Sequence, residues 1–184
     1  MFDRIAKSLI LLAQSLPKPL YVVGGAVRDH LIGFREKTTD WDICSPMLAE
    51  EFAAIATAHG FTINAVYRNT GTVKLHDYEN NEFEFSSFRS DEYVRGEHRP
   101  AKIFFTQDME ADARRRDFTC NAVYYCIREG KFYDPLCGER DIREKKMRTV
   151  REARRVFGED GLRLMRLAMA SSAIAQKIPS NTHI

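Results

Sequence analysis

Two aspartates separated by one residue, Asp40 and Asp42, are the side chains best suited to chemistry in this 184-residue sequence. They begin the alternating segment 40–44, which predicts a β-strand, and alternate residues of a strand face the same side. Their backbones are then about 6–7 Å apart, with Trp41 and Ile43 facing a core. Such paired carboxylates suit Mg²⁺, which binds one or two carboxylates together with substrate phosphates. The alternative is a solvated Asp-x-Asp at a strand end.

A glycine-rich turn precedes this aspartate pair. Gly24 and Gly25 follow an apolar strand predicted at 20–23 and open a helix predicted to end at Gly33. Glycines at such a turn let backbone N–H groups approach an anion, and a helix N-terminus favours negative charge. Arg28 lies in the first turn of the helix, within reach of phosphate oxygens. An ordinary glycine turn is the alternative, but the aspartates that follow favour a site for phosphate and metal.

The elements that must position these residues follow from periodicity and turn signals. Apolar residues at helical spacing predict an N-terminal helix at 5–16 that ends before Pro17. Strands are predicted at 20–23, 40–44, 61–67, 72–77, 82–88 and 102–105, a polar loop at 90–100, and helices at 46–59, 117–126 and from Glu139 onward. This order predicts an α/β (α+β) fold, a mixed sheet with flanking helices and a helical C-terminal piece. The turn at 133–138 is the predicted domain boundary, giving domains 1–137 and 138–184.

The composition narrows the class of protein. The chain has 28 Lys and Arg residues against 26 Asp and Glu, with 44% hydrophobic residues. These values predict a folded soluble protein and exclude a strongly basic nucleic-acid coat, although a local basic groove remains compatible. The four cysteines form no C-x-x-C pair, which predicts reduced thiols in a cytoplasmic protein. No apolar run reaches the roughly 20 residues of a membrane span, so no membrane partner is expected.

Read in order, the motifs resemble those of the class II tRNA nucleotidyltransferase and bacterial poly(A) polymerase family, within the polymerase-β-like nucleotidyltransferase superfamily. The glycine turn with Arg28 and the Asp40-x-Asp42 pair carry this resemblance first. Three later segments are also similar to motifs of the family: Arg115-Arg116-Asp117-Phe118-Thr119-x-Asn121-Ala122, Asp134-Pro135 with Gly138 and Asp141, and Glu159-Asp160-x-x-Arg163. The resemblance extends from about residue 20 to about residue 168. It implies a nucleotidyltransferase head domain followed by the beginning of a helical neck.

The resemblance implies an enzyme that adds C and A from CTP and ATP to the 3′ end of tRNA. Asp40 and Asp42 would hold two Mg²⁺ ions, one for the attacking 3′-hydroxyl and one for the triphosphate and leaving pyrophosphate. A third carboxylate is usual in this superfamily. Glu84 is the candidate, and Glu82, which shares its strand face, is the alternative.

The remaining motifs imply nucleotide contacts. Gly24, Gly25 and Arg28 would bind phosphate, as would Arg115 and Arg116. The other residues expected to bind the nucleotide are Asp117, Asp160 and Arg163. An arginine fork suits phosphate, and Asp117 can accept a hydrogen bond from a ribose hydroxyl. Alternatively, Asp117 caps a helix while the arginines are solvated.

The pair Asp160 and Arg163 is similar to the base-selecting motif of the family. Three residues apart, the two side chains share a helix face. The carboxylate can accept from the exocyclic amine of C or A, and the guanidinium can donate to the ring nitrogen beside it. G and U present the reverse pattern and would leave both groups badly paired. The alternative is a local ion pair worth only about 0.3–0.5 kcal/mol.

Two other functions stay open. One is addition of A alone, or of poly(A). The other is a truncated or split-chain head that binds nucleotide but is inactive on tRNA without further domains. The second arises because the resemblance fades after Ala168, where the neck of the family would continue. A complementing chain or domain that binds tRNA is conceivable, and the oligomeric state is open.

Overall fold

The computed structural model describes residues 5–33, 40–93 and 100–159, together with positions 163, 165, 167 and 168. For Asp40 and Glu159 it describes the backbone alone. The helices are α1 (Lys7–Ser15), α2 (Gly25–Leu31), α3 (Ala49–Ala58), α4 (Met109–Arg114), the 3₁₀ turn η1 (Thr119–Asn121), α5 (Gly138–Arg143) and α6 (Ala153–Glu159). The strands are β1 (Tyr21–Val22), β2 (Asp40–Ser45), β3 (Thr62–Tyr67), β4 (Thr72–His76), β5 (Glu82–Ser87), β6 (Arg89–Glu92), β7 (Lys102–Phe105), β8 (Tyr124–Cys126) and β9 (Lys131–Tyr133).

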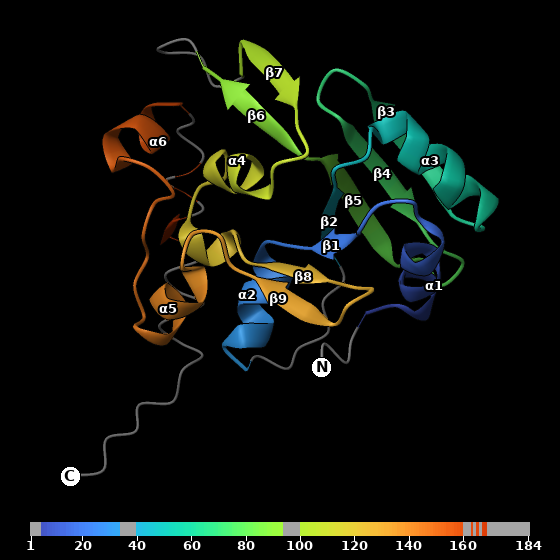
Figure 1. Cartoon of the computed structure of the whole chain (residues 1–184), viewed down its shortest axis with the longest axis horizontal. Helices are drawn as coiled ribbons and strands as arrows, with labels where there is room; N and C mark the ends of the chain where they lie inside the picture. The colour runs from blue at the N-terminus through green and yellow to red at the C-terminus, as the bar shows by residue number, and fades with distance from the viewer. Residues whose placement is uncertain are drawn as a thin grey trace.

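A seven-stranded sheet forms the centre of the molecule, in the order β3-β4-β5-β2-β1-β8-β9 (Figure 1). Strands β2 and β5 run parallel, whereas the other neighbouring pairs are antiparallel, so the sheet is mixed. Strands β6 and β7 form a separate antiparallel hairpin. The predicted fold class, a mixed sheet with flanking helices, is confirmed.

The two faces of the sheet are covered differently. Helices α1, α2 and α3 pack on one face, and the core there includes Leu12, Ile43, Phe52 and Phe85. Strand side chains that point to the opposite face pack with α4 and α6 in a second cluster. Its members include Tyr21, Val23, Cys44, Phe88, Ala113, Tyr124 and Val156. This second cluster covers only part of its face. Because alternate residues point to opposite sides, polar residues of β2, β4 and β5 face the part that it leaves open.

Most of the elements predicted from the sequence are confirmed. The six predicted strands are present with ends shifted by at most one residue, and the N-terminal helix and α3 occupy the predicted segments. The helix predicted at 117–126 is wrong. Only η1 is helical there, and β8 pairs with β1 in its second half. The aromatic residues Tyr124 and Tyr125 contribute to opposite faces of the sheet, as strand residues do, so sheet pairing overrides the helical spacing.

The loop predicted at 90–100 is also partly wrong, since Arg89–Glu92 is a strand. Backbone pairing with β7 supplies its hydrogen bonds, with Ser90 opposite Phe104 and Glu92 opposite Lys102. The polar side chains Arg89 and Asp91 of this strand pair with each other, so their polarity does not oppose the strand. Residues 94–99 of the predicted loop lie outside the described residues.

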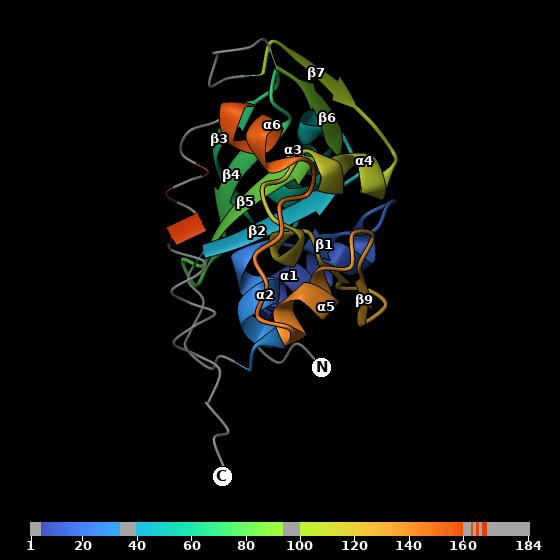
Figure 2. The same ribbon diagram turned by 90° about the vertical axis from the view of Figure 1, so that its left-hand side faces the viewer.

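The segment after the predicted domain boundary packs against the head. Ile142 of α5 lies in a cluster with Phe118 and Cys120, and α5 lies beside α2 (Figure 2). Asp134 stabilises the start of this helix, because its carboxylate accepts hydrogen bonds from the backbone N–H groups of Gly138 and Glu139. The boundary itself stays a prediction. In the part of the chain that the structure describes, every helix is too short or too polar to cross a membrane.

Candidate active site

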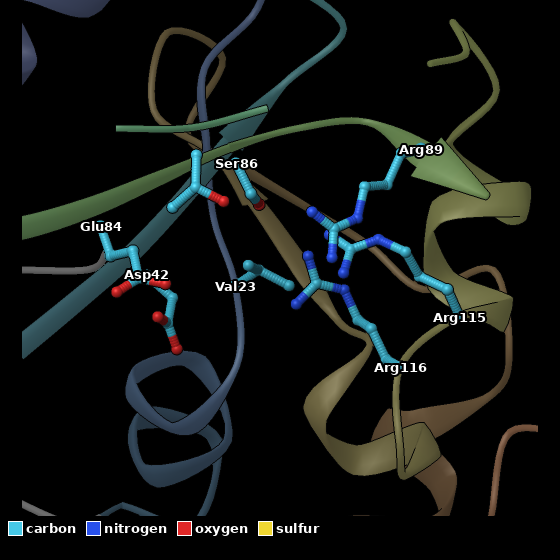
Figure 3. A pocket seen from close by; sticks show the side chains of 8 residues that line it. Val23, Asp42, Glu84, Ser86, Arg89, Arg115 and Arg116 are labelled. Carbon is cyan, nitrogen blue, oxygen red and sulfur yellow. The ribbon is translucent and has the colours of Figure 1, made fainter. Parts of the chain in front are cut away.

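A pocket of about 190 Å³ opens on the partly covered face of the sheet. Carboxylates stand on one side of it and guanidinium groups on the other, as Figure 3 shows. Its lining consists of Val23, Asp42, Thr72, Glu84, Ser86, Arg89, Arg115 and Arg116. The pocket therefore brings together four of the residues predicted for the site, namely Asp42, Glu84, Arg115 and Arg116. Its side chains come from β2, β4 and β5 on one side, and from β6 and the segment after α4 on the other.

The carboxylate side is built by parallel pairing of β2 with β5. Asp42 is the register partner of Glu84, and Asp40 is the register partner of Glu82. Asp42 and Glu84 thus lie side by side on adjacent strands. The predicted inward direction of Trp41 and Ile43 is confirmed, because both are buried in the core under the opposite face.

Register also separates the two candidates for the third carboxylate. Glu84 lines the pocket beside Asp42, whereas Glu82 is one step of the strand repeat away and is not among the described lining residues. Lys74 of β4 lies across from Glu84, with its Nζ 3.6 Å from Oε2 of Glu84, and both side chains are about half exposed. A surface ion pair of this kind contributes little and is easily exchanged for another cation.

The oxygen donors here fit Mg²⁺. Asp42 and Glu84 offer hard carboxylate oxygens at a pocket mouth, and the opposite guanidinium groups suit the phosphates that commonly complete a magnesium site. Among the described side chains, no three or more His, Cys, Asp or Glu residues are close enough to hold a metal ion together. The side chain of Asp40, the other predicted ligand, lies outside the described set.

The glycine turn lies directly against the carboxylate side. Gly24 has φ +80°, a left-handed conformation that glycine adopts without strain, and α2 begins at Gly25. A Cβ at Gly24 would lie 2.8 Å from Oδ2 of Asp42. The backbone N–H of Val23 also donates to the carbonyl of Asp42 at 3.0 Å. Absence of a side chain at Gly24 therefore leaves the space that the Asp42 carboxylate occupies.

Arg28 connects the glycine turn with the segment around Asp117. Its guanidinium Nη1 donates to Oδ1 of Asn121 at 2.8 Å and pairs with Asp29. Asn121 in turn donates from Nδ2 to Oδ1 of Asp117 at 3.2 Å, and the same Asp117 oxygen accepts from the backbone N–H of Phe118. These contacts join two predicted motifs, since Arg28 and Asn121 are 93 residues apart in the sequence. Gly24, Gly25, Arg28 and Asp117 surround the pocket residues without being among the described lining.

The guanidinium side depends on Asp112, a residue that the sequence analysis missed. Asp112 is fully buried on α4. Its Oδ1 accepts from Nε of Arg115 at 2.8 Å, and its Oδ2 accepts from Nη2 of Arg116 at 3.0 Å and from the hydroxyl of Tyr124 at 2.8 Å. The spacing of i, i+3 and i, i+4 between this aspartate and the two arginines was a signal that could have found it.

Burial and charge act in opposite directions on this cluster. Burial alone would raise the pKa of the Asp112 carboxyl, but Arg115 and Arg116 outweigh it and hold that pKa well below its usual value. Burial likewise disfavours the charged form of Arg116, yet Tyr124 and Asp112 keep its pKa well above the ordinary one. Burial raises the pKa of Tyr124, and its hydrogen bond to Asp112 acts in the same direction. The carboxylate and the guanidinium are therefore charged, and the phenol is neutral.

Arg89 adds a third guanidinium group to the same side of the pocket. Its backbone N–H donates to Oδ1 of Asp112 at 3.2 Å, and its Nη1 donates to the carbonyl of Thr70. Its Nε lies 3.0 Å from Oδ1 of Asp91, and both side chains are largely buried. Burial and the nearby charge of Arg115 lower the pKa of Arg89. In Figure 3 the ends of Arg89, Arg115 and Arg116 converge on the space opposite Asp42 and Glu84.

Arg163 lies against the backbone of the arginine segment. The side chain is buried, and it donates to the carbonyls of Val156 at 3.0 Å and Arg115 at 3.1 Å. Its guanidinium carbon also lies 5.6 Å from the ring centre of Tyr93. The contact with Arg115 brings the C-terminal segment next to the pocket. Asp160, its predicted partner in base selection, lies outside the described residues.

Comparison with known proteins identifies close relatives. A family model described as the poly A polymerase head domain matches residues 20–148. A CCA-adding enzyme of Geobacillus thermodenitrificans is 35% identical over 162 residues, which are 88% of this chain and 38% of the relative. A CCA-adding enzyme of Staphylococcus epidermidis is 31% identical over 96% of this chain and 42% of the relative. The chain thus spans about 40% of the length of these curated relatives.

Solved structures give the same result. The crystal structure of the Bacillus stearothermophilus CCA-adding enzyme in complex with CTP superimposes with a TM-score of 0.74 and 32% identity, covering 91% of this chain and 40% of that one. The Thermotoga maritima CCA-adding enzyme complexed with tRNA has a TM-score of 0.71 and 25% identity, covering 92% of this chain and 38% of that one. Both matches extend over nearly all of this chain.

Proposed function

Because this chain belongs to the poly A polymerase head domain family, we propose that it is the catalytic head of a CCA-adding tRNA nucleotidyltransferase. In this proposal it transfers C and A from CTP and ATP to the 3′ end of tRNA and releases pyrophosphate, in the cytoplasm. Residues 1–137 form the head and residues 138–184 begin the helical neck. The relatives at 31–35% identity are CCA-adding enzymes, and two of the matching solved structures contain CTP or tRNA.

The observation that carries the proposal is the arrangement of charge across the pocket. Asp42 and Glu84 face one side, and Arg89, Arg115 and Arg116 face the other. A nucleoside triphosphate needs both, because its phosphates bear negative charge while the reacting phosphate also has to meet a metal. A site that bound only a cation, or only an anion, would not need the opposite side.

The roles of the individual residues follow from this arrangement. Arg115 and Arg116 bind phosphate oxygens as guanidinium forks, and the backbone N–H groups at Gly24 and Gly25 contribute at the start of α2. Asp117 accepts a hydrogen bond from a ribose hydroxyl. Arg28 and Asn121 keep it in place, since Asn121 contacts both residues.

Asp40 and Asp42, with Glu84 beside Asp42, would hold two Mg²⁺ ions. When bound, these ions would activate the 3′-hydroxyl of the RNA and stabilise the leaving pyrophosphate. The chain supplies the rest of the geometry. The hydrogen-bonded pairing of β2 with β5 fixes the distance between the ligands, and the guanidinium groups orient the triphosphate in line with them.

Selection of C and A is assigned to Asp160 and Arg163. Arg163 supports this through its position, because its guanidinium contacts the carbonyl of Arg115 and so lies beside the phosphate-binding segment. The carboxylate of Asp160 accepts from the exocyclic amine that C and A share, and G and U lack that donor at the corresponding position.

The test is incorporation of each labelled nucleotide in turn. The purified chain is incubated with Mg²⁺ and a tRNA that lacks its terminal CCA, alongside an Asp42→Ala variant. C followed by A, without G or U, is the expected result for the unchanged chain, and no incorporation is expected for the variant. Equal incorporation of all four nucleotides would contradict the Asp160–Arg163 assignment. Retained activity of Asp42→Ala would contradict the metal assignment, and addition of A alone would indicate an A-adding enzyme.

A second candidate function is favoured by the coverage of the relatives, since about 60% of their length has no counterpart in this chain. In this alternative the head binds CTP and ATP but needs the remaining segments, or a complementing chain, to hold tRNA. Binding of CTP without incorporation into tRNA would support it. Incorporation that is restored by adding a neck and body from a relative would establish it.

A further inference from the structure

One buried carboxylate connects all three arginines of the pocket. Oδ1 of Asp112 accepts from the backbone N–H of Arg89 and from Nε of Arg115, and Oδ2 accepts from Nη2 of Arg116. The hydroxyl of Tyr124 completes the set at 2.8 Å. Through these contacts the start of β6 is tied to the segment after α4. Asp112 thus anchors the side chains of Arg115 and Arg116 directly, and it anchors Arg89 through its backbone.

We propose that Asp112 is a positioning residue that holds Arg89, Arg115 and Arg116 together as a three-arginine cradle for the phosphate chain of the nucleotide. The proposal rests on the proposed function, since it names how the same pocket takes its triphosphate. Arg89 is then a third phosphate ligand, additional to the arginines of the sequence motif.

The geometry explains why an anchor is needed. Guanidinium groups that converge on one space repel each other, and long arginine side chains lose considerable conformational freedom when they are held there. The negative charge of the Asp112 carboxylate offsets this repulsion between the guanidinium groups. The carboxylate takes Nε of Arg115 and one terminal nitrogen of Arg116, so that other N–H groups of both side chains remain directed to the pocket. A ligand then meets preorganised donors rather than having to order them.

Contacts of Arg89 fit the same role. The carbonyl of Thr70 and the carboxylate of Asp91 hold the guanidinium from the sides, at the β3–β4 turn and on β6 itself. Arg89 held in this way still lines the pocket, and Figure 3 shows its guanidinium end opposite Asp42 and Glu84.

The experiment measures affinity for inorganic tripolyphosphate and for CTP with Mg²⁺, by calorimetry, on the unchanged chain and on Asp112→Asn. Tripolyphosphate carries neither base nor ribose, so it reports on the cradle alone. We expect Asp112→Asn to bind both ligands about 10–100-fold more weakly, by analogy with the loss of metal affinity when the partner that orients a metal ligand is removed. Arg89→Met should weaken tripolyphosphate binding as well.

Two further measurements distinguish a role of Asp112 in positioning the arginines from a general loss of fold stability. Asp77→Asn alters a different buried carboxylate, which accepts from Ser8 and Asn81 at the far end of β4 from the pocket. It should lower thermal stability without changing the affinity for tripolyphosphate. In an Arg115→Gln, Arg116→Gln background, Asp112→Asn should cause little further loss, because the groups through which it acts are gone.

The outcomes keep the two proposals apart. If the unchanged chain binds neither CTP nor tripolyphosphate, the proposed function fails. If the unchanged chain binds both and Asp112→Asn binds equally well, only the role of Asp112 is overturned. If Asp112→Asn shows no cooperative melting, Asp112→Glu replaces it, since this variant keeps the charge but displaces both oxygens. Weaker tripolyphosphate binding by a cooperatively folded Asp112→Glu supports the cradle, and unchanged binding overturns it.

Discussion

The carboxylate of Asp42 packs against the α-carbon of Gly24, so closely that a methyl group on this glycine would come within 2.8 Å of Oδ2. The two residues belong to different elements, because Gly24 precedes α2 and Asp42 lies in β2. A hydrogen bond from Val23 to the carbonyl of Asp42 keeps these elements together. The glycine turn therefore shapes the carboxylate side of the pocket as well as the start of α2.

Gly24→Ala should impair nucleotide transfer far more than it impairs folding. The left-handed φ of +80° makes any side chain unfavourable by about 1–2 kcal/mol. Beyond that cost, the new methyl group displaces the Asp42 carboxylate. Gly60→Ala is the matched control, because Gly60 has φ +85° and no atom within 4 Å of the added Cβ. Urea unfolding should show both variants destabilised, with the additional contact present only in Gly24→Ala, while incorporation assays should show a loss only for Gly24→Ala. Equal activity of both would show that the contact with Asp42 is unimportant.

Glu84→Gln should lower Mg²⁺-dependent incorporation by about 100-fold or more, because a metal ligand stabilises the transition state by several kcal/mol. Glu82→Gln is the comparison, since Glu82 lies on the same strand and strand face but away from the described pocket lining. It should retain nearly full activity. The reverse result, with activity lost in Glu82→Gln and kept in Glu84→Gln, would assign the third carboxylate to the neighbour of Asp40.

Asp112 should make the stability of the fold sensitive to acid. Its pKa is lower in the folded chain than the ordinary value of about 3.9, so its contribution is fully present above that pH. As the pH falls further, the unfolded chain takes up the proton first and the contribution is lost. The difference in unfolding free energy between the unchanged chain and Asp112→Asn should be constant from about pH 7 to pH 5 and shrink below about pH 4. Urea titrations at several pH values measure it. A difference that persists unchanged to pH 2.5 would contradict this.

The four cysteines should differ sharply in reactivity in the native chain. Cys44, Cys120 and Cys126 are buried, and burial raises the pKa of Cys120 to about 12. Cys137 is exposed at the start of α5. Because the thiolate is the reactive form, a thiol reagent at pH 8 should modify Cys137 quickly and the other three only on unfolding. Mass spectrometry of peptides after a short reaction identifies the modified residues. Rapid labelling of Cys44 would show that the sheet opens far more often than its packing indicates.

Local patterns in the sequence predicted part of the carboxylate side of the pocket. Strand alternation predicted that Asp40 and Asp42 share a face, and that Glu84 projects away from the buried neighbours Phe83 and Phe85. The parallel pairing that makes Glu84 the neighbour of Asp42 could not be predicted in the same way. It depends on a crossover through α3, β3 and β4, and strand order is a property of the whole sheet.

The guanidinium side was predicted less completely. The motif identified Arg115 and Arg116, whereas Asp112, which precedes the motif on α4, was not predicted. In the segment that follows, helical periodicity predicted a helix at 117–126, where β8 instead pairs with β1. The two-residue strand β1 lies inside the sheet and pairs with β2 on one side and β8 on the other. This pairing is a property of the tertiary structure, so local spacing does not predict it. Arg89 lines the pocket because the start of β6 is hydrogen-bonded to Asp112 through the backbone N–H of Arg89, a tertiary contact that the sequence does not reveal.

Strand β1 also determines when the molecule can be completed during synthesis. It emerges early, with Tyr21 and Val22, but it is hydrogen-bonded on one side to β2 and on the other to residues 124–126. While the chain grows, β2 to β5 can pair among themselves, whereas β1 has an open edge until about 100 further residues have followed. Such long-range closure is slow compared with local hairpins. Translation therefore produces β2 and β5, which bear Asp42 and Glu84, first. Arg115 and Arg116 follow only shortly before β8, the strand that pairs with the open edge of β1.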